Sequence, residues 1–208
     1  SDLEDTAARY TGDPVEMPSG EALLAAWEPR IKRYSAPFLA DENIYGGNAG
    51  FSYTIERKYF VSSEGARITE NRTYARLSAH GFIKAADGME LPLYRSWSAF
   101  TPDGLPGDGD VLAEVDELID TLIALRDAPV VEPYTGPAIL SGRSAAVFFH
   151  EILGHRVEGH RQKSESEGQT FKKHVGRPIL PGHIDIIFDP GLAGFDDHDM
   201  MGHYRYDD

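Results

Sequence analysis

Apolar side chains recur at two different spacings along this chain, and each spacing predicts its own kind of element. The helical spacing is clearest at 110–127, where one stripe carries eight apolar residues: Val111, Leu112, Val115, Leu118, Ile119, Leu122, Ile123 and Leu125. Asp110 stands at the start of this stripe and is a residue type that caps helices. A second helix is predicted to begin after Ser19 and to run through Ile31, with Pro29 kinking or ending it.

Alternation of apolar and polar residues predicts three strands between these two helices. The strands are expected at 51–61, 66–85 and 89–100. A glycine-rich turn region at 43–50 precedes them, and the turns Ser63-Glu64-Gly65 and Ala86-Asp87-Gly88 join them. The pattern therefore predicts an α+β fold, with an antiparallel meander sheet packed by the long amphipathic helix.

A different pattern follows in the second part of the chain. Residues 128–137 hold three prolines and are expected to form a linker. A short strand at 138–140, a tight turn and a helix from about Arg143 should come next. We therefore expect two domains, an α+β N-terminal region at 1–130 and a second domain at 131–208.

The helix expected after that turn carries the residues that point most directly to chemistry. Residues 150–155 read His-Glu-Ile-Leu-Gly-His and follow an apolar run at 145–149, which we expect to be buried. Imidazole nitrogens bind zinc, and a glutamate beside them can serve as a general base. His150 and His155 are therefore candidate metal ligands, and Glu151 is the candidate base.

The spacing of these histidines differs from that of the common zinc-protease motif. Four helical steps keep two side chains on one face, whereas five steps of about 100° leave the two rings about 140° apart. One wide i→i+5 turn would bring His150 and His155 together, and such turns gather at functional sites. Gly154 lacks a Cβ and would make that distortion easy.

Glu158 could orient an imidazole, act as a third ligand, or be a surface carboxylate.

The string HEILGHRVEGHR at 150–161 resembles the signature of the TldD/PmbA family of zinc metallopeptidases, formerly called modulators of DNA gyrase. Active members of that family carry His-Glu-x-x-x-His followed closely by a Glu-Gly pair, which here is Glu158-Gly159. Other stretches are similar to family segments, so the resemblance covers most of residues 50–208. These stretches are Tyr59–Gly65, Lys172–Pro178, Ile184–Asp189 and the final Tyr206-Asp207-Asp208.

The resemblance implies a zinc-dependent, cytoplasmic peptidase that hydrolyses unfolded or short peptides inside a homo- or hetero-dimer with a related subunit. It implies that His150 and His155 bind zinc and that Glu151 activates water. Family members add a cysteine ligand from further along the chain, and this sequence has no cysteine. We therefore expect a fragment that is truncated at its C-terminus and lacks the family's N-terminal portion. Two histidines alone hold zinc weakly, so the isolated chain is expected to be inactive.

Composition and charge argue against two other kinds of partner. A net charge of −14 would repel nucleic-acid phosphates, and no apolar run reaches the roughly 18 residues of a membrane span. The basic side chains near the motif are expected to form a solvated rim or to contact a substrate carboxylate. They are Arg156, Arg161, Lys163, Lys172, Lys173 and Arg177.

The remaining histidines are expected to have other roles. His160 would lie on the far side of a regular helix, and His174 and His183 would face solvent. His80 is expected to be a structural residue in a strand. The acid-rich segment 196–199, with a nearby histidine, is expected to be a solvated loop or a frayed end.

Two rival hypotheses come from other classes of protein. In the first, the chain is a non-catalytic binding or scaffold subunit of a peptidase heterodimer, and Glu151 argues against it because a relic motif has no need of a base. In the second, the metal is structural and the chain is an assembly module. A structural site would be expected to have a closed set of four ligands, whereas two are assigned here.

Overall fold

Two compact units make up the chain in a computed structural model that describes residues 9–63, 65–161, 163, 165–166, 168–196, 198–200 and 203. Unit 1 consists of residues 1–129 with 189–208, and unit 2 consists of residues 130–188. The break after residue 129 lies one residue from the expected break after residue 130. Residues 189–208 cluster with unit 1, whereas the sequence pattern places them in the second domain.

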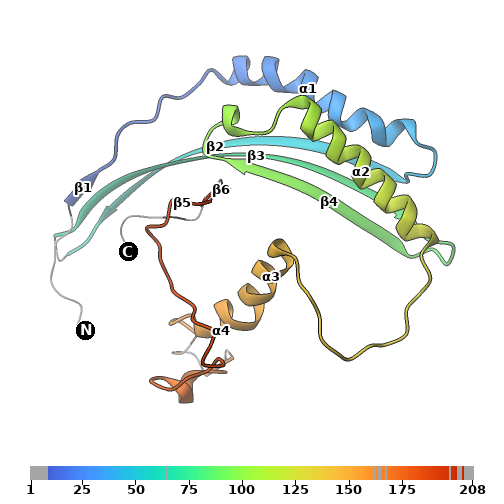
Figure 1. The fold of residues 1–208 in the computed structure, drawn as a ribbon. Coiled ribbons are helices and arrows are strands. Elements are labelled where there is room, and N and C mark those ends of the chain that lie inside the picture. Colours follow the sequence, from blue (N-terminus) through green and yellow to red (C-terminus); the bar gives the residue numbers. More distant parts are fainter. Residues whose placement is uncertain are drawn as a thin grey trace. The chain divides into compact units, whose positions relative to one another are not determined.

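Unit 1 has an α+β fold built on one curved sheet (Figure 1). Its long strands are β2 (Gly46–Val61), β3 (Arg67–Lys84) and β4 (Glu90–Ala99), and both neighbouring pairs are antiparallel. The predicted α+β class and the antiparallel meander are therefore confirmed. A short strand that the apolar pattern does not predict, β1 (Arg9–Thr11), pairs in parallel with the first residues of β3.

The turns between the strands contain glycines with positive φ. Gly88 has a φ of +89° and donates its N–H to the carbonyl of Ala85 at 2.9 Å, and Gly65 has a φ of +96°. Both turns were predicted at these positions. The region 43–50 is only partly a turn, because β2 already begins at Gly46 and the glycines there belong to the sheet.

Two helices, α1 (Gly20–Ala40) and α2 (Asp108–Asp127), cover the same face of this sheet (Figure 1). The Ser19 hydroxyl accepts a hydrogen bond from the Ala22 N–H at 3.4 Å and caps α1, as the sequence predicts. The sequence predicted that Pro29 kinks or ends the helix near Ile31. The predicted end is wrong, because α1 continues to Ala40.

The continuation of α1 past its prolines has a physical cause in its buried face. A proline inside a helix costs about 3 kcal/mol or more, because it removes one hydrogen bond and crowds the preceding turn. Trp27, Tyr34 and Phe38 lie along one stripe of α1 and are 5%, 0% and 2% exposed. Burial of a large side chain stabilises by about 1.5–3 kcal/mol, so three of them contribute about 4.5–9 kcal/mol, which offsets the cost of about 6 kcal/mol for the two prolines of α1, Pro29 and Pro37.

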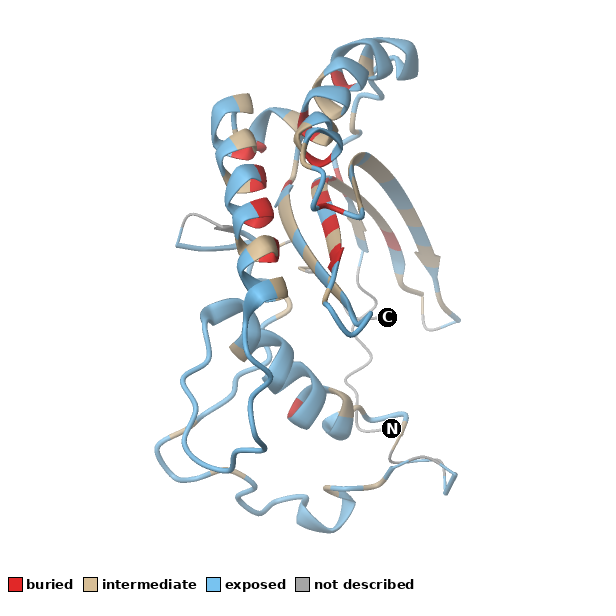
Figure 2. Ribbon diagram, turned by 90° about the vertical axis from the view of Figure 1, so that its right-hand side faces the viewer, coloured by how far each residue is buried: buried red, intermediate tan, exposed pale blue. Residues whose placement is uncertain are grey.

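The core of unit 1 lies between the two helices and the sheet (Figure 2). Alternate residues of β3 point into it, which explains why Ala75, Leu77 and Ala79 are buried while Arg76 and His80 are exposed. The predicted apolar stripe of α2 supplies the facing layer. The buried residues of this core are Trp27, Tyr34, Phe38, Ile44, Ala75, Leu77, Ala79, Ile83, Ala99, Leu105, Val111, Val115, Leu118, Ile119 and Leu122.

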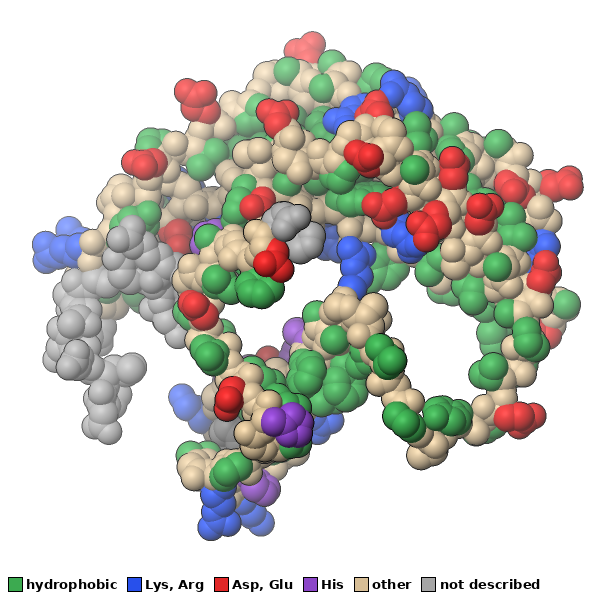
Figure 3. All heavy atoms as spheres, viewed as in Figure 1, with side chains coloured by type: hydrophobic (Ala, Val, Ile, Leu, Met, Phe, Trp, Pro, Cys, Tyr) green, Lys and Arg blue, Asp and Glu red, His purple; other side chains and the backbone are tan. Residues whose placement is uncertain are grey.

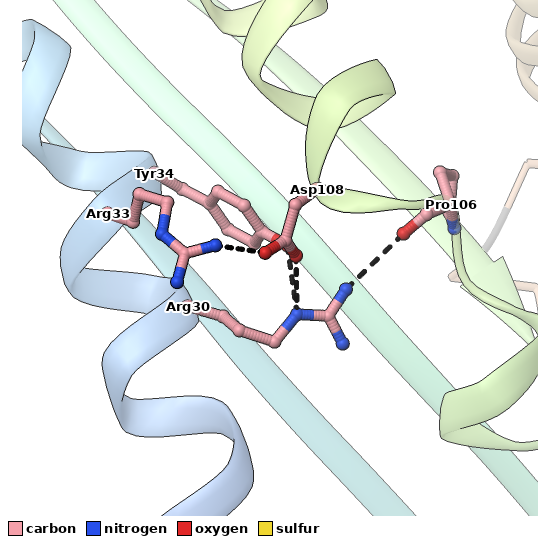
Figure 4. Close-up of polar contacts among 5 residues, drawn as sticks. All are labelled: Arg30, Arg33, Tyr34, Pro106 and Asp108. Carbon is pink, nitrogen blue, oxygen red and sulfur yellow. Dashed lines mark hydrogen bonds and ion pairs between the residues drawn. The ribbon is translucent and has the colours of Figure 1, made fainter.

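A polar cluster around the Asp108 carboxylate joins the first residue of α2 to α1 (Figure 4). Arg30 donates its Nε–H to Oδ1 at 2.7 Å, and Arg33 and Tyr34 also donate to this carboxylate. The helix begins here, after a short turn at η1 (Pro102–Gly104), and not at the predicted cap Asp110. A carboxylate in the first turn of a helix interacts favourably with the helix dipole, and here three donors from α1 hold it in place. These contacts account for a start of α2 two residues before Asp110.

Contacts within this cluster shift the pKa values of Asp108 and Tyr34. The hydrogen bond from Tyr34, together with Arg30, holds the pKa of Asp108 below its usual range. Burial raises the pKa of the Tyr34 hydroxyl, so this group stays protonated and remains a donor. The Arg30 guanidinium also lies 4.0 Å from the ring centre of Trp27, which stacks on Phe51 at 3.8 Å.

The C-terminal segment of unit 1 forms a small hairpin from β5 (Gly194–Phe195) and β6 (His198–Asp199). The Asp199 carboxylate accepts a hydrogen bond from the Phe100 N–H at 3.0 Å, and the His203 ring packs edge-on against Phe100 at 5.4 Å. Asp199 is exposed, as expected for a solvated loop, but it lies in a strand and not in a frayed end, and His203 is half-buried. The family-like Tyr206-Asp207-Asp208 lies outside the described residues.

We predict that Asp108→Asn lowers the free energy of unfolding at neutral pH by about 1–2 kcal/mol, because the ionised acceptor of three donors is lost. The folded pKa of Asp108 lies below its unfolded value of about 3.9. Its contribution is therefore present above pH 3.9 and is lost as pH falls through the folded pKa. Urea unfolding between pH 7 and 2.5 measures this. Asp110→Asn, at an exposed position of the same helical turn, is the control and should change little.

We predict that Gly47→Ala destabilises unit 1 by about 1–3 kcal/mol, the usual cost of overpacking a core. A Cβ at Gly47 would lie 2.5 Å from Cγ of Phe38, which is buried and cannot move aside. Gly50 lies in the same strand, and a Cβ there would meet only Ser78 Oγ at 3.7 Å. The melting temperature of the Gly47→Ala variant should therefore lie clearly below that of the Gly50→Ala variant. Equal melting temperatures would contradict the close packing of Gly47 against Phe38.

Candidate metal centre

The motif lies in unit 2 on a continuous helical segment with three parts. They are α3 (Gly142–Phe149), the π-helical turn η2 (His150–Gly154) and α4 (His155–Val157). The N–H of His155 donates to the carbonyl of His150, which is the i→i+5 hydrogen bond of a wide turn. The wide turn that the five-residue spacing requires is therefore confirmed.

The wide turn brings the two imidazoles together. The ring centres of His150 and His155 are 4.3 Å apart, with the ring planes at 75°. One ligand atom from each of His150, Glu151 and His155 lies within 4.8 Å of the other two. Two imidazole nitrogens and one carboxylate oxygen that converge in this way fit the donor set of a zinc site.

Exposure of the motif differs from the expectation. The side chains of His150 and Glu151 are 61% and 63% exposed, and that of His155 is 35% exposed. The apolar run 145–149 was expected to be buried, and this is wrong because Phe148 is 45% exposed. Among the described residues of unit 2, Leu153 alone is buried (Figure 2). This unit has too few residues of its own to cover the helix.

The segment before α3 is not the predicted strand. Residues 138–140 have no ladder partner among the described residues, and Ile139 is fully exposed. A strand needs a neighbour for its backbone hydrogen bonds, and the described part of unit 2 contains no sheet. Within the described part of unit 2, the motif helix is therefore not mounted on a strand. A short 3₁₀ turn, η3 (Lys172–His174), follows it.

Glu158 contacts His155 and is not among the convergent ligand atoms. Its Oε1 lies 2.8 Å from His155 Nδ1, and its Oε2 accepts a hydrogen bond from Arg161 Nε at 2.5 Å. The hydrogen bonds from His155 and Arg161 hold the pKa of Glu158 below its usual range. Of the three alternatives for Glu158, this geometry favours an imidazole partner.

Arg161 is a contributor to the site that the sequence analysis missed. It was expected in a basic rim, but it lies three residues after Glu158 and pairs with it. The i,i+3 spacing of opposite charges was the signal that could have identified this pair. Arg156 is also engaged, because its Nη1 donates to Thr170 Oγ1 at 3.1 Å.

The other histidines lie apart from the convergent group. His160 Nε2 is 3.5 Å from Glu158 Oε2, and His174 and His183 are exposed as expected. His80 lies in β3 on the sheet face opposite the helices, where its ring stacks on Tyr94 at 5.6 Å.

Charge is distributed unevenly between the units. Residues 130–188 contain seven Lys or Arg and six Asp or Glu, a charge of +1, so the residues of unit 1 carry −15 and the whole chain carries −14. In the view of Figure 3, acidic side chains are spread over unit 1, and basic ones lie beside the histidines of unit 2. No helix in the described ranges combines the length and apolar character required to cross a bilayer.

Comparisons with known proteins add little to this geometry. No protein-family model and no curated protein matches the chain. A solved structure of a minor lipoprotein from Acinetobacter baumannii is 15% identical over 58% of this chain and 91% of that one, with a TM-score of 0.13. A TM-score this low carries no information about the fold.

The glycine in the wide turn is not required for its geometry. Gly154 has ordinary helical angles, φ −46° and ψ −61°, and an added Cβ would approach the Phe149 carbonyl oxygen at 3.8 Å. The expectation was that the missing Cβ makes the distortion easy, and the open space around this position shows that a Cβ would hinder it little. The wide turn is compatible with any small side chain at this position.

We predict that Gly154→Ala leaves metal binding within about threefold of the wild type, because alanine fits the turn and has the higher helix propensity. Isothermal titration calorimetry with zinc measures the affinity. Gly154→Pro is the contrasting variant, because proline would crowd the preceding turn and should abolish binding. A tenfold loss on Gly154→Ala would contradict the prediction.

Proposed function

We propose that this chain carries the metal-binding segment of a zinc-dependent peptidase that hydrolyses unfolded or short peptides. The observation that carries the proposal is the convergence of His150, Glu151 and His155 across the wide turn. A His-Glu-x-x-x-His helix with a following Glu-Gly pair resembles TldD/PmbA peptidases, and that resemblance supplies the peptide substrate, the cytoplasmic location and the related dimer partner.

Each residue of the group has a separate task in this proposal. Zinc, when bound, lowers the pKa of a water molecule and polarises a substrate carbonyl. His150 and His155 offer neutral imidazole nitrogens, which are preferred zinc ligands. Glu151 follows the first ligand directly and accepts the proton of the attacking water. Its exposed carboxylate leaves room for an extended peptide backbone.

The ligand set needs one more protein donor for a tight catalytic site. Either Glu151 ligates zinc itself, or the third ligand comes from outside this sequence. The cysteine that the resemblance implies is absent from the chain. In the second arrangement Glu151 is free to act as the base, and this is the arrangement that we favour.

A second candidate function is a non-catalytic binding or scaffold subunit. The observation that favours it is the apolar surface of α3, where Val147 is 56% exposed and Phe148 is 45% exposed. Side chains of this kind next to a motif are typical of a surface that another protein covers. The two candidates differ in whether Glu151 is needed for turnover.

We predict that Glu151→Gln in the native protein retains zinc but lowers hydrolysis of an unstructured peptide by at least about 10²-fold, because the proton acceptor is lost. Zinc content by mass spectrometry and peptide cleavage by chromatography provide the two readings. Glu165→Gln, at an exposed acid of the same unit, is the control and should keep full activity.

The outcomes distinguish the two candidate functions. Equal cleavage by the Glu151→Gln and wild-type proteins would remove Glu151 from the mechanism. Zinc binding without any cleavage by the wild type would favour the scaffold subunit. Loss of zinc in Glu151→Gln would make Glu151 a ligand.

A further inference from the structure

The contact between Glu158 and His155 determines where the His155 ring carries its proton. A carboxylate offers only acceptor atoms, so the 2.8 Å contact between Glu158 Oε1 and His155 Nδ1 requires a proton on Nδ1. Neutral His155 then has its free lone pair on Nε2. A neutral imidazole in water prefers the opposite arrangement, with the proton on Nε2, so the tautomer depends on Glu158.

Glu158 itself is not fixed by the helix. Regular α4 ends at Val157, and Glu158 has φ −56° and ψ 124°, outside the helical region. Its side chain is 33% exposed, and a carboxylate on a short loop would otherwise sample several rotamers. The guanidinium of Arg161 holds Oε2 at 2.5 Å, which leaves Oε1 directed at His155.

The two histidines of the motif differ in this respect. The carboxylate nearest to His150 is that of Glu151, and its Oε1 lies 3.9 Å from Nε2, beyond hydrogen-bond distance. His155 has a close and charge-assisted partner, and its side chain is the less exposed of the two. Of the two histidines of the motif, His155 is therefore the one whose tautomer is set by a carboxylate among the described residues.

We propose that Arg161 and Glu158 are positioning residues, which hold His155 as the Nδ1–H tautomer and leave its Nε2 free to bind metal. This inference rests on the proposed zinc site and deepens it. A carboxylate behind a ligand histidine orients the ring and raises the basicity of the ligating nitrogen, and its loss usually costs 10–100-fold in metal affinity. Arg161 acts one step further out, through Glu158.

The tautomer can be measured in the metal-free protein by ¹⁵N NMR of labelled histidine, in alkaline buffer where imidazoles are neutral. We expect the His155 signals of the wild type to show Nδ1–H. Glu158→Ala should convert His155 mainly to Nε2–H, and Arg161→Ala should produce a mixture. Arg161→Lys, which keeps the charge, should restore much of the wild-type pattern. The signals of His150 should not change in any of these variants.

Zinc affinity gives a second and independent reading. Glu158→Ala should bind zinc about 10–100-fold more weakly than the wild type, and Arg161→Ala should show a smaller loss. Lys163→Ala removes the charge of an exposed side chain in the same segment and is the control, with an expected change of less than twofold. If Glu158→Ala does not fold, Arg161→Ala keeps the carboxylate in place and still tests the inference.

The two readings separate this inference from the proposed function. A wild-type His155 that carries its proton on Nε2, or a tautomer unchanged in Glu158→Ala and Arg161→Ala, would overturn the positioning role even if the protein cleaves peptides. A tautomer that shifts as expected supports the positioning role even if the wild type cleaves no peptide, and in that case the peptidase proposal alone fails.

Discussion

One backbone hydrogen bond, from the N–H of His155 to the carbonyl of His150, underlies everything that is chemically distinctive about this chain. On a regular helix the two rings would diverge by about 140°, and no side-chain rotation could bring them to one point. The wider winding puts their centres 4.3 Å apart and leaves one atom of the Glu151 carboxylate within 4.8 Å of a nitrogen of each ring. The proposed zinc site, the proposed base and the proposed positioning role of Glu158 all presuppose this local change of winding.

The two units differ in what holds them together. Unit 1 has a continuous core, and the Asp108 cluster joins its two helices, so this unit has the contents of an independent domain. Unit 2 has one buried side chain among its described residues and no sheet. Its order comes from helix geometry and from local pairs such as Arg161–Glu158 and Arg156–Thr170. The candidate site is thus held by short-range contacts, which is consistent with a surface that other protein covers.

Periodicity predicted the parts of the fold in which burial dominates. The three strands and the long helix follow from alternation and from the α2 stripe, because each buries one face. The pattern failed where another force decides: Pro29 is tolerated because Trp27, Tyr34 and Phe38 are buried, and α2 begins at Asp108 because of its donors on α1. At the site, the five-residue spacing predicted the wide turn. No sequence pattern could show that Phe148 is exposed, or that a Cβ would fit at Gly154.

The π turn also has a bearing on how such motifs relate to one another. It takes up one more residue than a regular turn while leaving the helix axis unbroken from Gly142 to Val157. A four-residue separation on an ordinary helix and a five-residue separation on a loosened one therefore aim two imidazoles at one place. A single inserted or deleted codon is enough to pass between them, so two motifs that differ in length need not differ in the coordination geometry that they offer.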